Sequence, residues 1–131
     1  MKRVDTSSSV RYFAGIRRSD RYSILEYSPA TGYFVELWGN NSGVSVLDIA
    51  YVYAEDDDLP SSSTIDESGQ MQGLFYICMS NGLYKADISF STISSVFSGN
   101  LVGPLVSYDD FVVCWRRDSA SAKYKPFYYN V

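Results

Sequence analysis

The sequence contains no histidine among its 131 residues. This absence excludes nucleophile activation by a Ser-His-Asp or Cys-His arrangement, and it removes the commonest side chain that binds transition metals. The sequence also has neither a G-x-G-x-x-G element nor a Gly-Lys-Ser phosphate loop, so nothing in it supports a nucleotide pocket. We therefore expect a protein that is not an enzyme and that carries no cofactor and no metal.

Cysteine and long apolar runs are also scarce. The two cysteines, Cys78 and Cys114, lie in apolar runs without metal-ligand spacing, so we expect buried free thiols, with a mutual disulfide as the alternative. No stretch approaches the ~20 apolar residues of a membrane-spanning helix. Residues 1–9 include two basic side chains but not the apolar block of a secretory signal. We expect a chain made in the cytoplasm, without a signal peptide and without a membrane partner.

Aromatic side chains, in contrast, are abundant. The chain is 46% hydrophobic and 16% aromatic, with 12 tyrosines and 7 phenylalanines, a composition that suits pleated, half-buried surfaces. The length fits one domain, so we expect a basic N-terminal arm or first strand over residues 1–21 and a single β domain over residues 22–131. Residues 54–72 combine successive acids with proline and serine, a composition that predicts a mobile acidic loop.

Short strand-like runs, separated by turn residues, fill most of the remaining chain. The expected strands cover residues 10–16, 22–27, 33–38, 44–53, 74–80, 83–88, 93–97, 101–107, 111–117 and 124–129. The start-to-start spacing of neighbouring strands, about 8–12 residues, is typical of all-β sandwiches, barrels and propeller blades. The sequence therefore predicts an all-β fold, namely a small antiparallel sandwich or open barrel built from consecutive hairpins.

The clearest local prediction is a hairpin over residues 73–88. Asn81 and Gly82 can both take positive φ, as a two-residue type I′ turn requires, and the resulting register pairs Met79 with Tyr84. One face is then wholly apolar: Phe75, Ile77, Met79, Tyr84, Ala86 and Ile88. The other face carries four more apolar side chains: Leu74, Tyr76, Cys78 and Leu83. Because these four are too apolar for open water, we expect a second layer or a neighbouring subunit to cover them.

Three segments resemble the blade repeats of β-propellers. Residues 22–37 place a Pro-Ala-Thr-Gly turn between two strand-like runs, residues 73–88 contain an Asn-Gly-Leu-Tyr turn, and residues 96–117 contain a Ser-Gly-Asn turn. A propeller closes with about 4–8 blades, and a blade needs ~40–50 residues, so the chain has material for about three blades at most. The resemblance thus implies, as the alternative fold, partial propeller-like blades that oligomerisation completes.

Charge is distributed unevenly along the chain, which has a net charge of −4. Residues 1–21 hold six cations and two acids, whereas residues 55–67 hold six acids. The candidate interaction residues in these two regions are Arg11, Arg17, Arg18, Asp56, Asp57 and Asp58. Opposite charges of this kind can meet head to tail between subunits, and the alternative is that both regions are solvated surface. The negative net charge disfavours general nucleic-acid binding and leaves only the basic arm for such a contact.

An aromatic run near the end of the sequence supplies the other candidate interaction residues: Tyr124, Phe127, Tyr128 and Tyr129. Pro126 within this run suits an edge strand, and three aromatic residues after it suit an arm that docks onto another subunit. Exposed aromatic side chains also mark contacts with glycans or proteins, whereas cross-strand aromatic pairs are the structural alternative.

Two classes of function are consistent with these features. The first is a non-enzymatic structural subunit of a larger complex, with copies of itself or other subunits as partners, and its composition is similar to that of virion proteins such as phage head or tail components. The alternative is a carbohydrate-binding, lectin-like module that uses surface tyrosine and tryptophan. Calcium binding by the acids around Asp56 is disfavoured, because they lack the alternating acids and central glycine of a calcium loop.

Overall fold

The computed structural model describes residues 2–5, 9–18, 21–41, 43–52, 74–108, 111–118 and 120–130. These residues form eleven strands and no helix, which confirms the all-β prediction. The strands are β1 (Lys2–Asp5), β2 (Val10–Arg18), β3 (Arg21–Ser28), β4 (Tyr33–Asn40), β5 (Val46–Val52), β6 (Leu74–Met79), β7 (Gly82–Ala86), β8 (Ile93–Ser98), β9 (Leu101–Tyr108), β10 (Phe111–Asp118) and β11 (Lys123–Asn130). Every expected strand is present with small differences at its ends, and β1 is additional.

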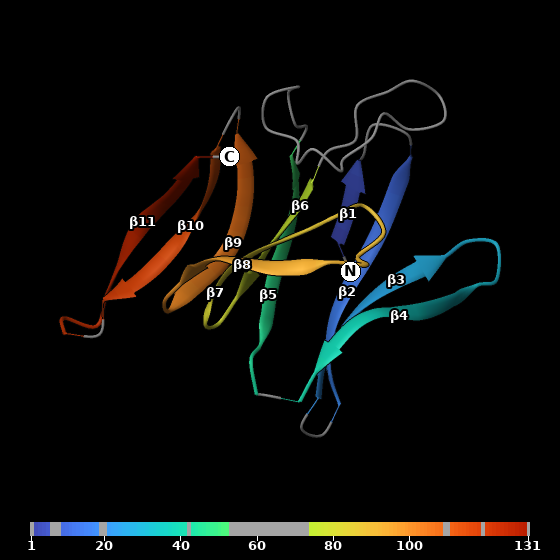
Figure 1. Cartoon of the computed structure of the whole chain (residues 1–131), viewed down its shortest axis with the longest axis horizontal. Coiled ribbons are helices and arrows are strands. Elements are labelled where there is room, and N and C mark those ends of the chain that lie inside the picture. The colour runs from blue at the N-terminus through green and yellow to red at the C-terminus, as the bar shows by residue number, and fades with distance from the viewer. Residues whose placement is uncertain are drawn as a thin grey trace.

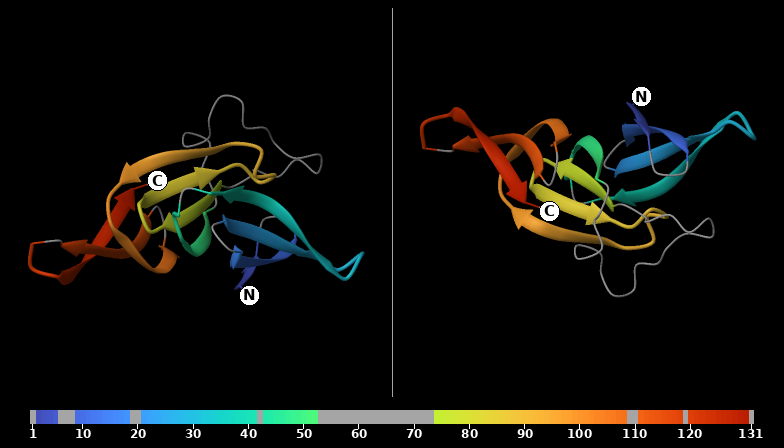
Figure 2. Two further views of the ribbon diagram at one scale, coloured as in Figure 1. Left: turned by 90° about the horizontal axis from the view of Figure 1, so that it is seen from below. Right: turned by 90° about the horizontal axis from the view of Figure 1, so that it is seen from above.

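The strands form three antiparallel sheets, which Figure 1 shows beside one another. The N-terminal sheet has the order β1-β2-β3-β4, the central sheet β5-β6-β7-β8, and the C-terminal sheet β11-β10-β9. Strands that are neighbours in each sheet are also neighbours in the sequence, so each sheet is a series of hairpins, as predicted, and none closes into a barrel. The β3–β4 and β10–β11 hairpins project at opposite ends of the molecule (Figure 2).

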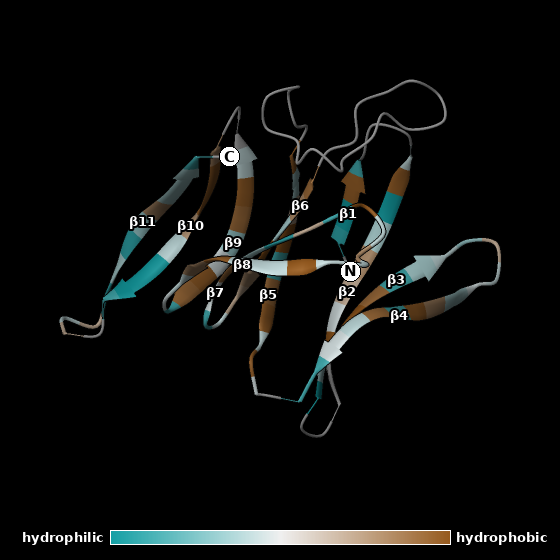
Figure 3. Ribbon diagram, viewed as in Figure 1, coloured by the Kyte–Doolittle hydropathy of each residue, from teal (hydrophilic) through white to brown (hydrophobic). Residues whose placement is uncertain are grey.

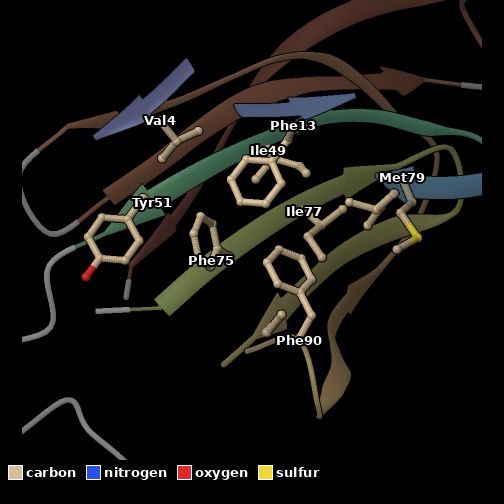
Figure 4. Packing of buried hydrophobic residues seen from close by; sticks show 10 residues of the cluster. Val4, Phe13, Ile49, Tyr51, Phe75, Ile77, Met79 and Phe90 are labelled. Carbon is tan, nitrogen blue, oxygen red and sulfur yellow. The ribbon is translucent and has the colours of Figure 1, made fainter. Parts of the chain in front are cut away.

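The central sheet is buried on both faces. On one face, Phe75 and Ile77 of β6 pack with Phe13 of the N-terminal sheet in a first core cluster, where the Phe13 and Phe75 ring centroids are 5.2 Å apart (Figure 4). On the other face, Cys78 packs with Leu105 of the C-terminal sheet in a second cluster. Hydrophobic residues accordingly recur along the strands of all three sheets (Figure 3). The predicted cover of the second face is confirmed, and the C-terminal sheet provides it.

The β6–β7 hairpin has the predicted faces, but its predicted register is wrong. Met79 pairs with Gly82, so Ser80 and Asn81 form the turn, and the register differs from the expected one by two residues. Neither Ser80 nor Asn81 has positive φ, so the type I′ turn does not form. Gly82 lies in β7, where a Cβ would clash with the Phe97 carbonyl oxygen of β8. The neighbouring strand therefore requires this glycine, and a shift of two residues leaves the side-chain alternation unchanged.

Asp48 joins the first strands of the three sheets. Its carboxylate accepts hydrogen bonds from Lys2 Nζ of β1 at 2.8 Å and from the Leu105 backbone N–H of β9 at 2.7 Å. Lys2 Nζ also donates to the Leu105 carbonyl oxygen at 3.4 Å. Since Asp48 belongs to β5, these bonds hold β1, β5 and β9 together along one side of the molecule.

The connection between β7 and β8 inserts Phe90 into the first core cluster. Phe90 has a φ of 58°, a left-handed conformation that a phenylalanine rarely adopts. The Asp87 carboxylate accepts hydrogen bonds from the hydroxyls of Ser89 and Ser91 and from the Thr92 backbone N–H. The strand predicted to reach residue 88 therefore ends at residue 86, because this hydrogen-bonded loop replaces it.

Candidate functional site

The C-terminal sheet has one face that points away from the central sheet. Side chains alternate between the two faces of a strand, and Val112 and Cys114 of β10 point to the buried side. Their neighbours Val113 and Trp115 therefore point outward, together with the residues paired with them on β9 and β11. We define the C-terminal outer face as Val102, Val106, Phe111, Val113, Trp115, Arg117, Tyr124, Pro126, Tyr128 and Asn130.

This C-terminal outer face is apolar and exposed. Tyr128 is 64% exposed, Tyr124 55%, Val106 54% and Trp115 42%. Arg117 is the single charged residue in the set. Trp115 and Tyr124 also line a shallow apolar hollow on the face. Because soluble monomers rarely expose large contiguous apolar patches, this surface has the character of a binding site.

The N-terminal sheet also has a face that points away from the central sheet. The described residues that alternate with the buried Phe13 and Ile24 form this N-terminal outer face: Arg3, Asp5, Val10, Tyr12, Ala14, Ile16, Arg21, Ser23, Leu25, Tyr27, Phe34 and Glu36. Of these described side chains, none belongs to either core cluster between the sheets. Val10 is 43% and Phe34 45% exposed, and the Phe34 ring lies 5.4 Å from that of Tyr27. Both ends of the stack of sheets therefore present apolar side chains outward.

The predicted aromatic residues of β11 are divided between the two faces of their strand. Tyr124 and Tyr128 lie on the C-terminal outer face and are exposed. Phe127 and Tyr129 point to the central sheet and pack against the second core cluster. The Phe127 ring centroid is 4.3 Å from that of Phe97 in β8. Only the first pair is thus positioned to contact another molecule.

Arg11, another predicted interaction residue, is engaged inside the protein. Its Nε and Nη2 donate to the Glu26 carboxylate at 2.6 and 2.7 Å, and its Nη1 donates to the Ile88 carbonyl at 2.6 Å. The guanidinium carbon lies 5.0 Å from the ring centroid of Phe13 and 5.1 Å from that of Phe75. Arg11 therefore ties the N-terminal sheet to the central sheet through contacts that the sequence pattern did not indicate.

The remaining predicted residues lie elsewhere. Arg17 and Arg18 lie at the end of β2, where they pair with Tyr22 and Arg21 of β3. The structure does not bring them to the C-terminal outer face, which belongs to a different sheet. The acidic segment 54–72, with the predicted residues Asp56, Asp57 and Asp58, lies outside the described residues.

Cys78 and Cys114 are free, buried and hydrogen-bonded to each other between the central and C-terminal sheets. The hydrogen bond with Cys114, together with burial, raises the pKa of the Cys78 thiol far above its usual range. The expectation of buried free thiols is confirmed, and Cys78 remains protonated at neutral pH.

The end of the β10–β11 hairpin has a polar hollow lined by Arg116, Arg117, Asp118 and Lys125. Hydrogen bonds from the Ser121 hydroxyl and the Ala120 N–H lower the pKa of Asp118. The Asp118 carboxylate therefore stabilises the turn between β10 and β11.

Neither a metal site nor a membrane-spanning helix is found in the described part of the chain. Across the described ranges, no group of three or more cysteines and acids is placed to hold a metal ion. Nor does any helix there have the length and apolar character needed to cross a membrane. The chain matches no protein-family model, and no curated protein or solved structure is significantly similar to it.

Proposed function

We propose that the protein is a non-enzymatic structural subunit that joins copies of itself or neighbouring subunits through its outer sheet faces. The observation that carries this proposal is the C-terminal outer face, which exposes four aromatic side chains, Phe111, Trp115, Tyr124 and Tyr128, and contains a single charged residue, Arg117. Cores of protein interfaces are enriched in aromatic residues and arginine and depleted of other charges, as this face is.

The size of the face supports the same proposal. An aromatic side chain can bury about 150–250 Å², so four that are about half exposed offer roughly 300–500 Å². Val102 and Val106, 37% and 54% exposed, add to this area. The total approaches but does not reach the ~800 Å² that each partner contributes to a standard interface. The face is thus suited to be one part of a larger contact surface.

The test is the oligomeric state of the purified chain, measured by sedimentation as a function of concentration. We expect the wild type to associate, and the double variant Trp115→Ser/Tyr128→Ser to dissociate at concentrations where the wild type does not. Tyr33→Ser is the matched control, because Tyr33 is 74% exposed but lies on the projecting β3–β4 hairpin. A wild type that remains monomeric and binds no other subunit would contradict the proposal.

The likeness to virion proteins remains a prediction from composition. The mass of the native particle from which the chain is purified tests it directly. A particle in the megadalton range would support a head or tail component, and a particle of a few chains would not.

Carbohydrate binding is the second candidate, favoured by one observation. Trp115 and Tyr124 line the apolar hollow on a sheet face, where sugar rings can stack on aromatic rings. This function ranks second because the polar side-chain groups of the defined face that can bind sugar hydroxyls are few: Arg117, the Asn130 amide, the Trp115 indole N–H and the tyrosine hydroxyls. Fluorescence titration with oligosaccharides tests it: binding at this face would change the Trp115 emission, and Trp115→Ser would abolish the change.

A further inference from the structure

The three sheets follow one another in a repeated arrangement. Each sheet is a series of hairpins that begins at an edge strand, and the three beginning strands β1, β5 and β9 are linked through Asp48. The N-terminal sheet packs one face on the central sheet through the first core cluster. The central sheet in turn packs its other face on the C-terminal sheet through the second cluster. The same arrangement, in which one sheet packs a face on the next and their first strands are adjacent, therefore occurs twice.

A further sheet could pack in the same way at each end of the stack. The C-terminal outer face is the side on which a following sheet would lie, and the N-terminal outer face is the side for a preceding one. Both faces expose apolar side chains, including Val10 and Tyr128, and the N-terminal outer face also carries the ion pairs Arg3–Asp5 and Arg21–Glu36. Repeated sheets of this kind form radial rings, in which each sheet covers the next and the last covers the first.

We propose that two copies of this chain close a ring of sheets, in which the C-terminal outer face of each copy packs on the N-terminal outer face of the other. The proposal rests on the assembly function proposed above and names the partner and the two contacting surfaces. Closed radial arrangements contain about 4–8 sheets. Since the described residues of each chain form three sheets, two copies give a ring of six, whereas one copy gives too few sheets and three copies too many.

The available area favours this ring over a contact that uses one face. The C-terminal outer face alone offers less than the ~800 Å² per partner of a standard interface. In the ring, each copy uses both outer faces and buries correspondingly more. A contact between two C-terminal outer faces would leave the exposed apolar side chains of the N-terminal outer faces, Val10 and Phe34, without a covering layer.

The charges on the two faces are compatible with burial. On the N-terminal sheet, Arg3 is paired with Asp5 at 3.2 Å, and Arg21 with Glu36 at 3.0 Å. These four charged side chains of the N-terminal outer face are therefore already paired within the chain. The C-terminal outer face contributes Arg117 alone, at the end of β10, where an interface rim is polar.

The experiment uses one glutamate substitution on each face, at exposed positions whose replacement spares the core. Tyr128→Glu alters the C-terminal outer face, and Val10→Glu alters the N-terminal outer face. Trp115→Glu and Phe34→Glu are second variants for the two faces, and circular dichroism verifies that each variant folds. Sedimentation equilibrium then measures the mass of each variant alone and of equimolar mixtures.

We expect the wild type to have twice the 14.7 kDa mass of the chain. Each face variant alone should show a dimer dissociation constant raised about tenfold or more, because every contact between its copies contains a glutamate. An equimolar mixture of Tyr128→Glu and Val10→Glu should regain dimers, because one contact of each mixed pair then joins two unaltered faces. Recovery on mixing is specific to contacts between different faces.

Other results would overturn the ring. If Tyr128→Glu weakens association but Val10→Glu does not, two C-terminal outer faces contact each other. The ring is then wrong, while the assembly function stands. A wild-type assembly of more than two copies would indicate an open stack of sheets. The ring would then also be wrong, while the assembly function stands. A wild type that stays monomeric overturns the ring, and if Trp115 then responds to oligosaccharides the assembly function is replaced as well.

Discussion

The central and C-terminal sheets show how one sequence pattern serves two purposes. Both sheets place apolar side chains on both of their faces, as in Phe75 and Tyr76 of β6 or Val112 and Val113 of β10. In the central sheet, Phe75 and Tyr76 are 0% and 3% exposed because a sheet lies on each side. In the C-terminal sheet, the described residues cover one face, and the other exposes Val106 and Tyr128. Two-sided apolar strands therefore occur both in the middle layer and in the layer for which we propose a further partner.

The largest effect should come from two adjacent residues of β9 that point to opposite faces. Leu105 is 1% exposed in the second core cluster, whereas Val106 is 54% exposed on the C-terminal outer face. Leu105→Ala should lower the free energy of unfolding by about 2–5 kcal/mol, because it leaves a cavity between sheets. Val106→Ala should change it by about 0.5 kcal/mol or less in the monomer. Urea unfolding measures both, and equal losses would show that the outer face is covered within the chain.

The next effect concerns the link between the first strands. Asp48→Ala removes the acceptor of Lys2 and leaves the Leu105 N–H without its partner, so stability should fall by about 2–3 kcal/mol. Asp48→Asn is the matched control: its amide oxygen can still accept from the Leu105 N–H, and about half of the loss should be restored. Thermal unfolding measures the series. An Asp48→Ala variant with unchanged stability would show that packing alone holds the three sheets together.

A smaller and pH-dependent effect is expected at Asp87, in the connection that inserts Phe90. Burial raises the pKa of Asp87, but hydrogen bonds from Ser89, Ser91 and Thr92 outweigh it, and the pKa is lowered overall. The stabilisation is therefore present above the unfolded pKa of ~3.9 and is lost as the pH falls through the lower folded value. Asp87→Ala should cost about 1 kcal/mol at pH 7, as loss of a helix cap does.

The control for this effect is Asp87→Asn, which keeps an acceptor oxygen but does not titrate. Urea midpoints at neutral pH and near pH 3 should converge for the wild type and Asp87→Asn as the wild-type carboxylate is protonated. A constant difference between the two proteins across this range would mean that the charge of Asp87 does not contribute to holding the loop.

Local patterns predicted much of this fold. The alternation of apolar residues predicted which face of β6 each side chain occupies, and turn residues predicted where strands end. The register of the hairpin could not be predicted in this way, because Gly82 is required by the close approach of Phe97 in β8. The strand β1 was missed because its short run, Lys2–Asp5, has one buried apolar residue, Val4. Its position depends on Asp48, which lies 46 residues away.

The candidate site was predicted in part, for a similar reason. The aromatic run of β11 was predicted to mark an interaction surface, and alternation places Tyr124 and Tyr128 on one face and Phe127 and Tyr129 on the other. The division follows from the strand period alone, but which pair is exposed depends on where the central sheet lies. Deleting the whole run would therefore remove part of the second core cluster along with the outer face. The outward residues Tyr124 and Tyr128 give the cleaner test.

The smallest expected effect is on the rate at which the two cysteines are alkylated, which reports whether the central and C-terminal sheets stay packed together. Cys78 and Cys114 are 0% and 2% exposed between the central and C-terminal sheets, and the pKa of Cys78 is raised by its hydrogen bond with Cys114 and by burial. Because both thiols are buried, the native protein should react slowly with iodoacetamide, whereas the protein in denaturant should take up two equivalents. Mass spectrometry measures the uptake. If the native thiols react as fast as those of the unfolded protein, the C-terminal sheet separates from the central sheet in solution. The inner face of the C-terminal sheet would then be exposed to solvent for part of the time, as its outer face is.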